Sequence, residues 1–492
     1  MEKARLLIKK NKNLGFWIFF FLYIIYIYKT AFNINFFIDD YFFLKISRIK
    51  SIAEFLNFYL PFRNYSYKPL AGETFYFVIH LLNNNAFLGH VIAFITYFIG
   101  LVFLYKIIKL LKESDLLAKL TVFLYGISFV HVFQIYWFAT YQEIAIFAFL
   151  AISFYGFLKK KYILSILFFI FASLSKETAV LFAPFLILFV LILNKLNLKK
   201  IKNQIIPLIT IVILAFLFWL AYRYSLNFVT REDNYKMAWD LRLLLNNGMW
   251  YFFWGIGFPN FMPDYFRSIF SKPLPAFWQL IKNPETSIYF YLLIIYLMLL
   301  MIGLLIIVLP KFKNAKKYLF LIIYSLINFF IFLGPILFFR HKWMIRLSLP
   351  LIFIAFAEAV IIYLLLINKN KYIKYLGLFI LALYTIWNFF GVRVHENTST
   401  YLLENTIFYN TQKYFAKHRL EILKHDYIYF KDTTNNLPKG WNGSEKLKLS
   451  LSNSNFLDHF FPDEKIKVIY QSETKKIPEN AYILESNILL KQ

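Results

Sequence analysis

Two adjacent carboxylates, Asp39 and Asp40, follow the first long apolar run of the chain and lie among aromatic residues. Carboxylates at a membrane surface are costly unless they are paired or used in chemistry. Partial burial raises the pKa of a carboxyl group, and a general base benefits from such a shift. We therefore interpret Asp39 and Asp40 as a candidate catalytic base. The alternative is a helix N-cap beside a solvated acid.

A second candidate is the turn that contains Lys176 and Glu177, between the apolar runs 162–175 and 178–193. These runs are about 14 to 16 residues long, whereas a full crossing takes roughly 20. The turn of this hairpin is therefore expected slightly below the outer membrane surface. A lysine at that depth needs an anionic partner, and Glu177 and a lipid phosphate are the two candidates. An ion pair with no further role is the alternative.

Two further groups lie at predicted outer ends of apolar runs. Gln142 and Glu143 begin one run, where a carboxylate also interacts favourably with the helix dipole. Arg340, His341 and Arg346 precede another run. Guanidinium groups bind phosphate oxygens in bidentate contacts, and snorkelling to lipid head groups is the alternative. All these groups face one compartment and could hold a phosphate-linked donor and a base for its acceptor.

The composition places these residues in a membrane protein. The chain has 492 residues, of which 60% are hydrophobic and 16% charged, whereas soluble domains are roughly 45–50% apolar and about 25% charged. It has no cysteine, which excludes disulfides and thiolate sites. We predict an all-α polytopic protein with about eleven transmembrane helices. Their approximate spans are 14–34, 86–108, 116–137, 141–158, 162–175, 178–193, 205–222, 288–309, 318–338, 347–367 and 375–391.

The positions of the basic residues predict the orientation, because cytoplasmic loops are enriched in Lys and Arg. The loop 138–140 carries no basic residue. We therefore expect a plasma-membrane protein with a cytoplasmic N-terminus and an extracytoplasmic C-terminus. This placement explains the net charge of +27 better than nucleic-acid binding does. The Lys-rich segments are the N-terminal arm 1–13 and the loops 106–119, 159–161, 195–202, 311–317 and 369–374.

The apolar pattern divides the chain into a membrane domain, 1–391, and a polar tail, 392–492. Two outer loops of the membrane domain, 35–85 and 223–287, do not follow the apolar pattern. The tail begins with a helical pattern and continues with alternating apolar and polar residues, which are typical of strands. We predict that it forms a small α+β extracytoplasmic domain. Its expected helix and strands are 401–424, 427–430 and 466–470.

The sequence resembles the membrane glycosyltransferases of the GT-C superfamily, above all the protein mannosyltransferases. The resemblance covers roughly residues 1–390. Lys68 stands where the family has an arginine, and the tail lacks the tetratricopeptide pattern of some relatives. The resemblance rests on Asp39-Asp40, Tyr67-Lys68-Pro69-Leu70, Gln142-Glu143, Leu174-Ser175-Lys176-Glu177-Thr178 and, more loosely, the segment from Arg340 to Pro350.

This resemblance implies transfer of a sugar from a polyprenyl-phosphate donor to a hydroxyl of a protein, lipid or glycan on the outer face. The lack of a P-loop or a G-x-G-x-x-G motif fits a lipid-linked donor. A divalent cation beside the aspartates is left open, and a flippase of lipid-linked glycans and a non-catalytic scaffold are the alternatives. The implied roles are base for Asp39 or Asp40, donor-phosphate binding for Lys176, Glu177, Arg340, His341 and Arg346, and substrate contact for Tyr67, Lys68, Gln142 and Glu143.

Overall fold

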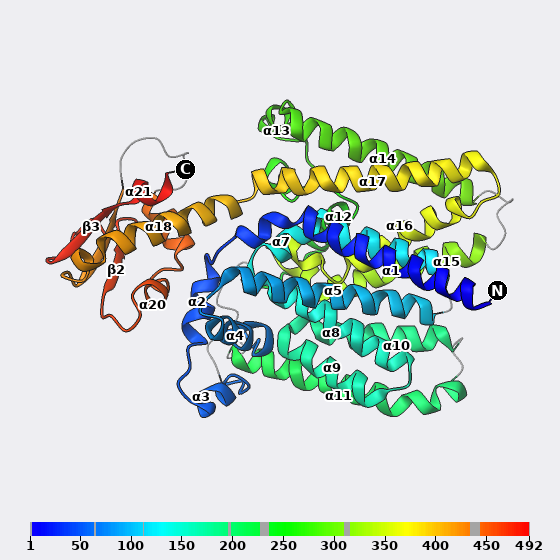
Figure 1. Ribbon diagram of the computed structural model, residues 1–492, viewed down its shortest axis with the longest axis horizontal. Coiled ribbons are helices and arrows are strands. Elements are labelled where there is room, and N and C mark those ends of the chain that lie inside the picture. Colours follow the sequence, from blue (N-terminus) through cyan, green and yellow to red (C-terminus); the bar gives the residue numbers. More distant parts are fainter. Residues whose placement is uncertain are drawn as a thin grey trace.

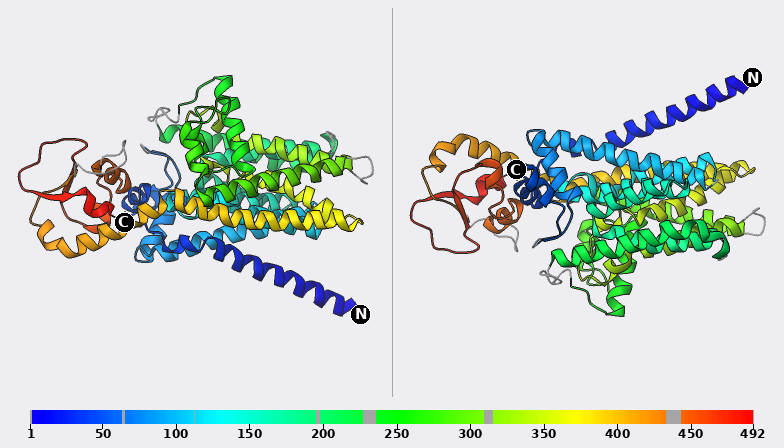
Figure 2. Two further views of the ribbon diagram at one scale, coloured as in Figure 1. Left: turned by 90° about the horizontal axis from the view of Figure 1, so that it is seen from above. Right: turned by 90° about the horizontal axis from the view of Figure 1, so that it is seen from below.

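The protein is a long helical bundle with a small domain at one end, as the computed structural model shows in Figure 1. The N-terminus lies at the opposite end of the bundle from that domain, and α1 diverges from the other helices toward its N-terminus (Figure 2). Parts of the Lys-rich loops 195–202 and 311–317 lie outside the described residues. The described residues are 2–62, 65–111, 113–194, 198–226, 236–308, 315–432 and 443–491.

Most bundle helices coincide with the predicted apolar segments, whereas α12 and α13 lie in the predicted outer loop 223–287. Its first half contains α1 (Glu2–Ile27), α5 (Ala86–Leu110), α6 (Asp115–Ile127), α8 (Tyr141–Leu158), α9 (Tyr162–Ser175), α10 (Phe182–Leu193) and α11 (Leu198–Ser225). Its second half contains α12 (Leu241–Gly255), α13 (Pro275–Ile281), α14 (Pro284–Val308), α15 (Ala315–Leu333), α16 (Leu351–Leu366) and α17 (Lys371–Thr398).

Among the described residues, six helices are long and apolar enough to cross a membrane, or seven if one bent pair forms a single span. The predicted helical architecture with several helices able to span a membrane is therefore confirmed, whereas the number of eleven spans stays a prediction. The apolar parts of α1, α9, α10 and α16 are shorter than a crossing usually requires. The six helices lie within 86–110, 138–158, 201–225, 284–308, 315–338 and 371–398.

Two irregular segments interrupt the bundle near the end that carries the C-terminal domain, which we call its outer end, and we call the opposite end its inner end. One follows α6, where the chain bends by 45° into η3 (Phe129–His131) and α7 (Val132–Ile135), followed by η4 (Phe138–Thr140). The other joins α15 to α16 through η8 (Gly334–Phe338) and η9 (Met344–Leu347). The elements η3 and α7 contact η9. Irregular backbone at membrane depth is tolerated where it is buried in protein or lines a cavity, so these segments mark a candidate site.

The helices α8 and α9 form a tight hairpin, and the turn that joins them lies at the inner end of the bundle. Ser153 donates a hydrogen bond to the carbonyl oxygen of Ser165 at 2.8 Å. A Cβ atom at Gly156 would lie only 3.0 Å from the backbone nitrogen of Ser165, so glycine permits this approach. Small residues allow two helix backbones to pack closely in membranes. This packing aligns the outer end of α8 with the outer end of α9.

The first outer loop forms a layer between the bundle and the C-terminal domain (Figure 1). Its elements are α2 (Asp39–Ile46), α3 (Ile52–Asn57), the π-helical turn η2 (Leu70–Thr74) and α4 (Phe75–Leu81). The turn η2 contacts α2, α8 and α9. It therefore lies between the helix that carries the two aspartates and the hairpin that carries Lys176.

The C-terminal domain confirms the predicted α+β architecture. Its three parallel strands have the order β2-β1-β3, and Tyr427 of β1 is opposite Lys467 of β2 and Ala481 of β3. The third strand was not predicted, and α17 continues past the predicted domain boundary to Thr398. The elements of the domain are α18 (Tyr401–Ile422), β1 (Tyr427–Lys431), α19 (Gly443–Ser450), α20 (Leu457–Phe460), β2 (Lys467–Tyr470), β3 (Ala481–Glu485) and α21 (Ser486–Leu490).

Candidate functional site

Asp40 is fully buried and holds three parts of the outer face together. Its Oδ1 accepts hydrogen bonds from the Tyr76 hydroxyl at 2.5 Å and from the backbone N–H of Ala139 at 2.8 Å. Its Oδ2 accepts from the backbone N–H of Phe37 at 3.0 Å. Burial raises the pKa of Asp40 to about 8, although these three hydrogen bonds favour the ionised form. Asp40 thus connects the start of α2 to α4 and η4.

Asp39 is exposed at the first position of α2. The residue before it, Ile38, has φ 51° and ψ −121°. A positive φ is a genuine outlier for a β-branched residue, and strained backbone of this kind clusters at functional sites. The strain is therefore adjacent to the more accessible of the two aspartates.

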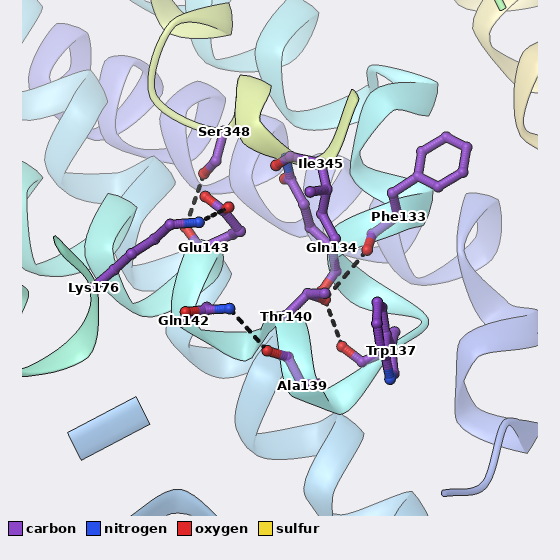
Figure 3. Close-up of polar contacts among 10 residues, drawn as sticks. All are labelled: Phe133, Gln134, Trp137, Ala139, Thr140, Gln142, Glu143, Lys176, Ile345 and Ser348. Carbon is purple, nitrogen blue, oxygen red and sulfur yellow. Dashed lines mark hydrogen bonds and ion pairs between the residues drawn. The ribbon is translucent and has the colours of Figure 1, made fainter. Parts of the chain in front are cut away.

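Lys176 forms a buried ion pair with Glu143 (Figure 3). The lysine follows the last residue of α9, and the glutamate lies in the first turn of α8. The backbone carbonyl of Glu143 also accepts a hydrogen bond from the Ser348 hydroxyl at 2.8 Å. The direct partner of Lys176 is thus Glu143 and not Glu177, which was one of the two partners that we expected from the sequence. The hairpin of α8 and α9 brings the two residues together.

Tyr222 of α11 fixes the turn that carries Lys176. Its hydroxyl donates to the carbonyl oxygen of Lys176 at 3.1 Å and also to that of Ser173. The sequence analysis missed Tyr222, because one tyrosine in an apolar helix carries no signal in a chain with 36 tyrosines. Only the contact between α11 and α9 reveals its role.

Glu177 is exposed and interacts electrostatically with Lys68, Lys176 and Arg346. Lys68 is partly exposed and connects this group to the first outer loop. Burial lowers the pKa of Lys68, and the negative charges of Glu177, Glu143 and Asp39 oppose this shift.

Lys68 thus lies near both the ion pair and Asp39. We call Asp39, Lys68, Glu143, Lys176, Glu177 and Arg346 the outer charge cluster.

Two other predicted substrate residues make structural contacts. The Tyr67 hydroxyl donates to the carbonyl oxygen of Tyr59 at 2.8 Å, and its ring centroid lies 6.0 Å from that of Tyr222. The Gln142 side chain donates to the carbonyl oxygen of Ala139 at 3.1 Å (Figure 3). These contacts fix the backbone next to Lys68 and Glu143, so Tyr67 and Gln142 support residues of the outer charge cluster.

The basic segment before α16 is divided between the cluster and the surface. Arg346 donates to the carbonyl oxygen of His341 at 2.9 Å, and its guanidinium lies 5.4 Å from the ring centroid of Phe339. Burial lowers the pKa of His341, and the charge of Arg346 acts in the same direction. Arg340 is exposed. Of these three residues, only Arg346 lines the small pocket beside Glu143 and Lys176.

Two cavities share part of their lining beside the ion pair. The small pocket, lined by Glu143, Lys176 and Arg346, has a volume of about 10 Å³, which is room for one water-sized molecule. A second cavity of about 290 Å³ lies between α5, α6, α8, α10, α15 and α16 and has nearly all apolar lining. Phe332 and Leu349 line both spaces. These two side chains therefore separate the apolar cavity from the small pocket of the outer charge cluster.

The inner end of the apolar cavity is marked by another ion pair. Glu113 lines the cavity and lies 2.9 Å from the ammonium group of Lys317. The volume of the cavity is near the lower end of the roughly 300–1,000 Å³ typical of small-molecule pockets. An apolar chain suits its lining, whereas a charged head group suits only the outer charge cluster.

The sequence matches no protein-family model and no curated protein. The resemblance to GT-C glycosyltransferases therefore stays a prediction. Within the described ranges, no group of three or more His, Asp or Glu side chains is placed to share a metal ion.

Proposed function

We propose that the protein is a membrane glycosyltransferase that uses a polyprenyl-phosphate sugar and acts on an acceptor hydroxyl at the extracytoplasmic face. The observation that carries this proposal is the outer charge cluster next to an apolar cavity, whose lining shares Phe332 and Leu349 with the small pocket of the cluster. A lipid-linked donor has this same division between an apolar chain and an anionic head group. The resemblance of the separate motifs to GT-C enzymes supports the same reaction.

The proposed reaction assigns separate roles to the anionic and cationic residues. Asp39 accepts the proton of the acceptor hydroxyl while the acceptor oxygen bonds to the anomeric carbon of the sugar. The bond between that carbon and the phosphate oxygen breaks, and the polyprenyl phosphate leaves with the electron pair. Lys68, Lys176 and Arg346 stabilise the negative charge that develops on the leaving phosphate.

The small pocket is too narrow for a sugar phosphate, so the donor must enter from the exposed side of the cluster or move its walls. Asp39 and Glu177 are exposed, and Lys68 and Arg346 are partly exposed, which gives a head group access from outside. Lys176 is engaged by Glu143. We propose that the donor phosphate first meets Lys68 and Arg346 and then competes with Glu143 for Lys176.

The topology that we propose for this enzyme has eleven spans in the plasma membrane, with the N-terminus inside and the C-terminal domain outside. The short helices α9, α10 and α16 count as spans in this arrangement because their ends adjoin irregular outer segments buried in the protein. The Lys-rich loops and the separation of the two termini in Figure 1 support this orientation.

One observation favours transport of lipid-linked glycans as a second candidate. Glu358 lies in the middle of α16 and is 5% exposed. Ionisable residues inside membrane helices often mark the path of a substrate. A flippase would depend on Glu358, whereas the proposed transferase would not. Glu358→Gln should therefore leave sugar transfer unchanged.

Comparative mass spectrometry of membrane glycans and glycoproteins tests the proposed function. Cells with and without the gene should differ by one sugar on a defined acceptor, and cells without it should accumulate the polyprenyl-phosphate sugar. The gene for the wild-type protein should restore the sugar, and the gene for Asp39→Asn should not. Identical glycans in both strains, or full restoration by Asp39→Asn, would overturn the proposal.

A further inference from the structure

The turn before Asp39 needs an external constraint. Ile38 has φ 51°, a value that a β-branched side chain strongly disfavours. Such a conformation persists only where the surrounding structure imposes it. On the bundle side the constraint is Asp40, which binds the backbone N–H groups of Phe37 and Ala139. These contacts hold the residues on either side of Ile38 but not the Ile38 amide itself.

The Ile38 amide is held by the C-terminal domain. Its N–H donates to the carbonyl oxygen of Ser450, the last residue of α19, at 2.8 Å. This contact joins positions more than 400 residues apart in the chain, so it forms only when the domain is docked. The domain thus supplies the hydrogen bond that the strained residue needs.

The domain also binds the chain before the turn. Asn405 of α18 accepts hydrogen bonds on Oδ1 from the backbone N–H of Asn35 at 2.9 Å and from its side chain at 3.2 Å. The Asn405 side chain donates to the carbonyl oxygen of Asn33 at 2.9 Å. One asparagine therefore fixes the path of the three residues that lead into the turn.

The chain after the turn is bound as well. Lys45, in the last turn of α2, lies 3.0 Å from the carboxylate of Asp458, and Arg48 donates to the Asp458 carbonyl oxygen at 2.8 Å. Before the turn, aromatic packing adds to these contacts, since the ring centroids of Phe36 and Phe408 lie 6.4 Å apart. The domain thus grips both sides of the turn that carries Asp39.

We propose that the C-terminal domain is the positioning device for Asp39, with Asn405 and Asp458 as positioning residues. The domain imposes the strained Ile38 conformation and so directs the Asp39 carboxylate toward the side of Lys68. The inference rests on the proposed role of Asp39 as the base. Docking of the domain then decides whether the acid is correctly placed, although no residue of the domain needs to touch the substrate.

Cysteine labelling tests this proposal without an activity assay, because the natural chain contains no cysteine. A single cysteine is introduced by Asp39→Cys, and its alkylation rate by a membrane-impermeant reagent is measured with and without Asn405→Leu. We expect the rate to change at least threefold, because the thiol leaves its fixed orientation. Asn410→Leu is the matched control, since Asn410 lies on the same helix and its side chain donates to the carbonyl oxygens of Leu489 and Lys491, which belong to the domain itself.

A second variant covers the case in which Asn405→Leu does not fold. Ile38→Gly should remove the strain, because glycine adopts positive φ freely. Arg48→Met removes a contact with the domain and should change the alkylation rate of the cysteine at position 39 when Ile38 is present. The same substitution should change this rate less in the Ile38→Gly variant, because the turn then no longer depends on the domain. An alkylation rate that is unaffected by Asn405→Leu and by Arg48→Met overturns the positioning role.

The activity readout separates this inference from the proposed function. In the chain with Asp39 intact, Asn405→Leu should lower kcat for sugar transfer with little change in KM for the donor. Altered thiol reactivity together with no sugar transfer by the wild-type protein would contradict the proposed function and leave the positioning role standing. Unaltered reactivity together with wild-type transfer would contradict the positioning role alone.

Discussion

At the scale of single residues, two neighbouring aspartates have opposite environments. Asp40 is fully buried and accepts three hydrogen bonds, whereas Asp39 is exposed beside a strained residue. A buried carboxyl group with all its bonds to the protein has no free direction from which a substrate could approach. The geometry therefore favours Asp39 as the base and Asp40 as the residue that positions the start of α2.

Substitution of each aspartate should separate chemistry from structure. Asp39→Asn should lower transfer about 10²- to 10⁴-fold with little loss of donor binding, because an amide cannot accept the proton. Asp40→Asn should mainly lower stability, because its amide group would face the N–H of Phe37 or Ala139. Transfer rates and thermal unfolding of the purified variants measure the two effects. Wild-type transfer by Asp39→Asn would contradict the base assignment.

The pKa of Asp40 predicts a specific dependence of stability on pH. Because folding raises this pKa from 3.8 to about 8, the folded protein binds one more proton than the unfolded chain between these values. The contribution of Asp40 to stability is therefore full below about pH 4 and is lost as the pH rises to about 8. Its slope is at most about 1.4 kcal/mol per pH unit.

Thermal unfolding at pH 5 and pH 8 measures this effect. The fall in unfolding temperature between the two values should be larger in the wild-type protein than in Asp40→Asn, because the amide does not titrate in this range. Equal falls would show that the Asp40 carboxyl group is already ionised in the folded protein at pH 5.

The buried ion pair allows structure and function to be tested separately. Lys176→Met leaves the Glu143 carboxylate buried without its partner, which typically costs about 3–5 kcal/mol. The double variant Lys176→Met with Glu143→Leu should recover much of this stability, because an apolar pair avoids the desolvation cost. It should not recover transfer, since the cation for the phosphate is missing. Recovery of transfer by the double variant would limit the pair to a structural role.

At the scale of secondary structure, the sequence predicts each helix better than the contacts between helices. Apolar runs of a given length indicate where α5, α8 and α14 lie, and the short runs beside Lys176 correctly indicate a hairpin. The partner of Lys176 could not be predicted, because Glu143 is 33 residues away and its proximity depends on how α8 packs on α9. Both Glu143 and Lys176 were candidates, but their pairing required the structure.

The bend after α6 and the turn before Asp39 were also beyond prediction. The bend lies at Ser128, and Gly126 is two residues before it. An isolated glycine in an apolar run is tolerated within a helix, so it does not by itself predict a bend. Ile38 is a poor residue for positive φ, so local preference argues against the conformation that it adopts. Contacts with the distant Ser450 override that preference. Local sequence rules fail where distant segments determine the backbone.

Tyr222 provides a prediction at this scale, since it joins α11 to the turn of the α9 hairpin. Tyr222→Phe removes the hydroxyl and leaves the carbonyl oxygens of Ser173 and Lys176 without this donor. Loss of such a buried bond typically costs about 1–3 kcal/mol. The KM for the donor should rise as Lys176 loses its fixed position. Tyr291→Phe, at an exposed site on α14, should change neither quantity. An unchanged KM in Tyr222→Phe would show that α11 does not position Lys176.

At the scale of the whole molecule, the candidate catalytic groups and the C-terminal domain share one end of the bundle. The turn at the start of α2 that carries Asp39 lies between the domain and the bundle helices, and the N-terminus lies at the opposite end of the bundle (Figures 1 and 2). The apolar cavity lies within the bundle and shares Phe332 and Leu349 with the small pocket beside Lys176. This arrangement, with the candidate groups and the domain at one end of the bundle, suits a donor held in the membrane and an acceptor that arrives from outside. It also allows the domain to hold the turn that carries Asp39.

Membrane topology is the prediction on which the placement of every site residue depends. Single cysteines can be introduced at exposed lysines or arginines of this cysteine-free chain and labelled with an impermeant reagent in intact cells. Lys475→Cys in the domain and Arg340→Cys before α16 should be labelled from outside, and Lys202→Cys only after permeabilisation, because Lys-rich loops stay in the cytosol. Arg340 is the decisive position, since a basic segment on the outer side departs from the usual charge bias. If Arg340→Cys, like Lys202→Cys, were labelled only after permeabilisation, Arg346 would lie on the opposite side of the membrane from the C-terminal domain. The outer charge cluster could then not form a site.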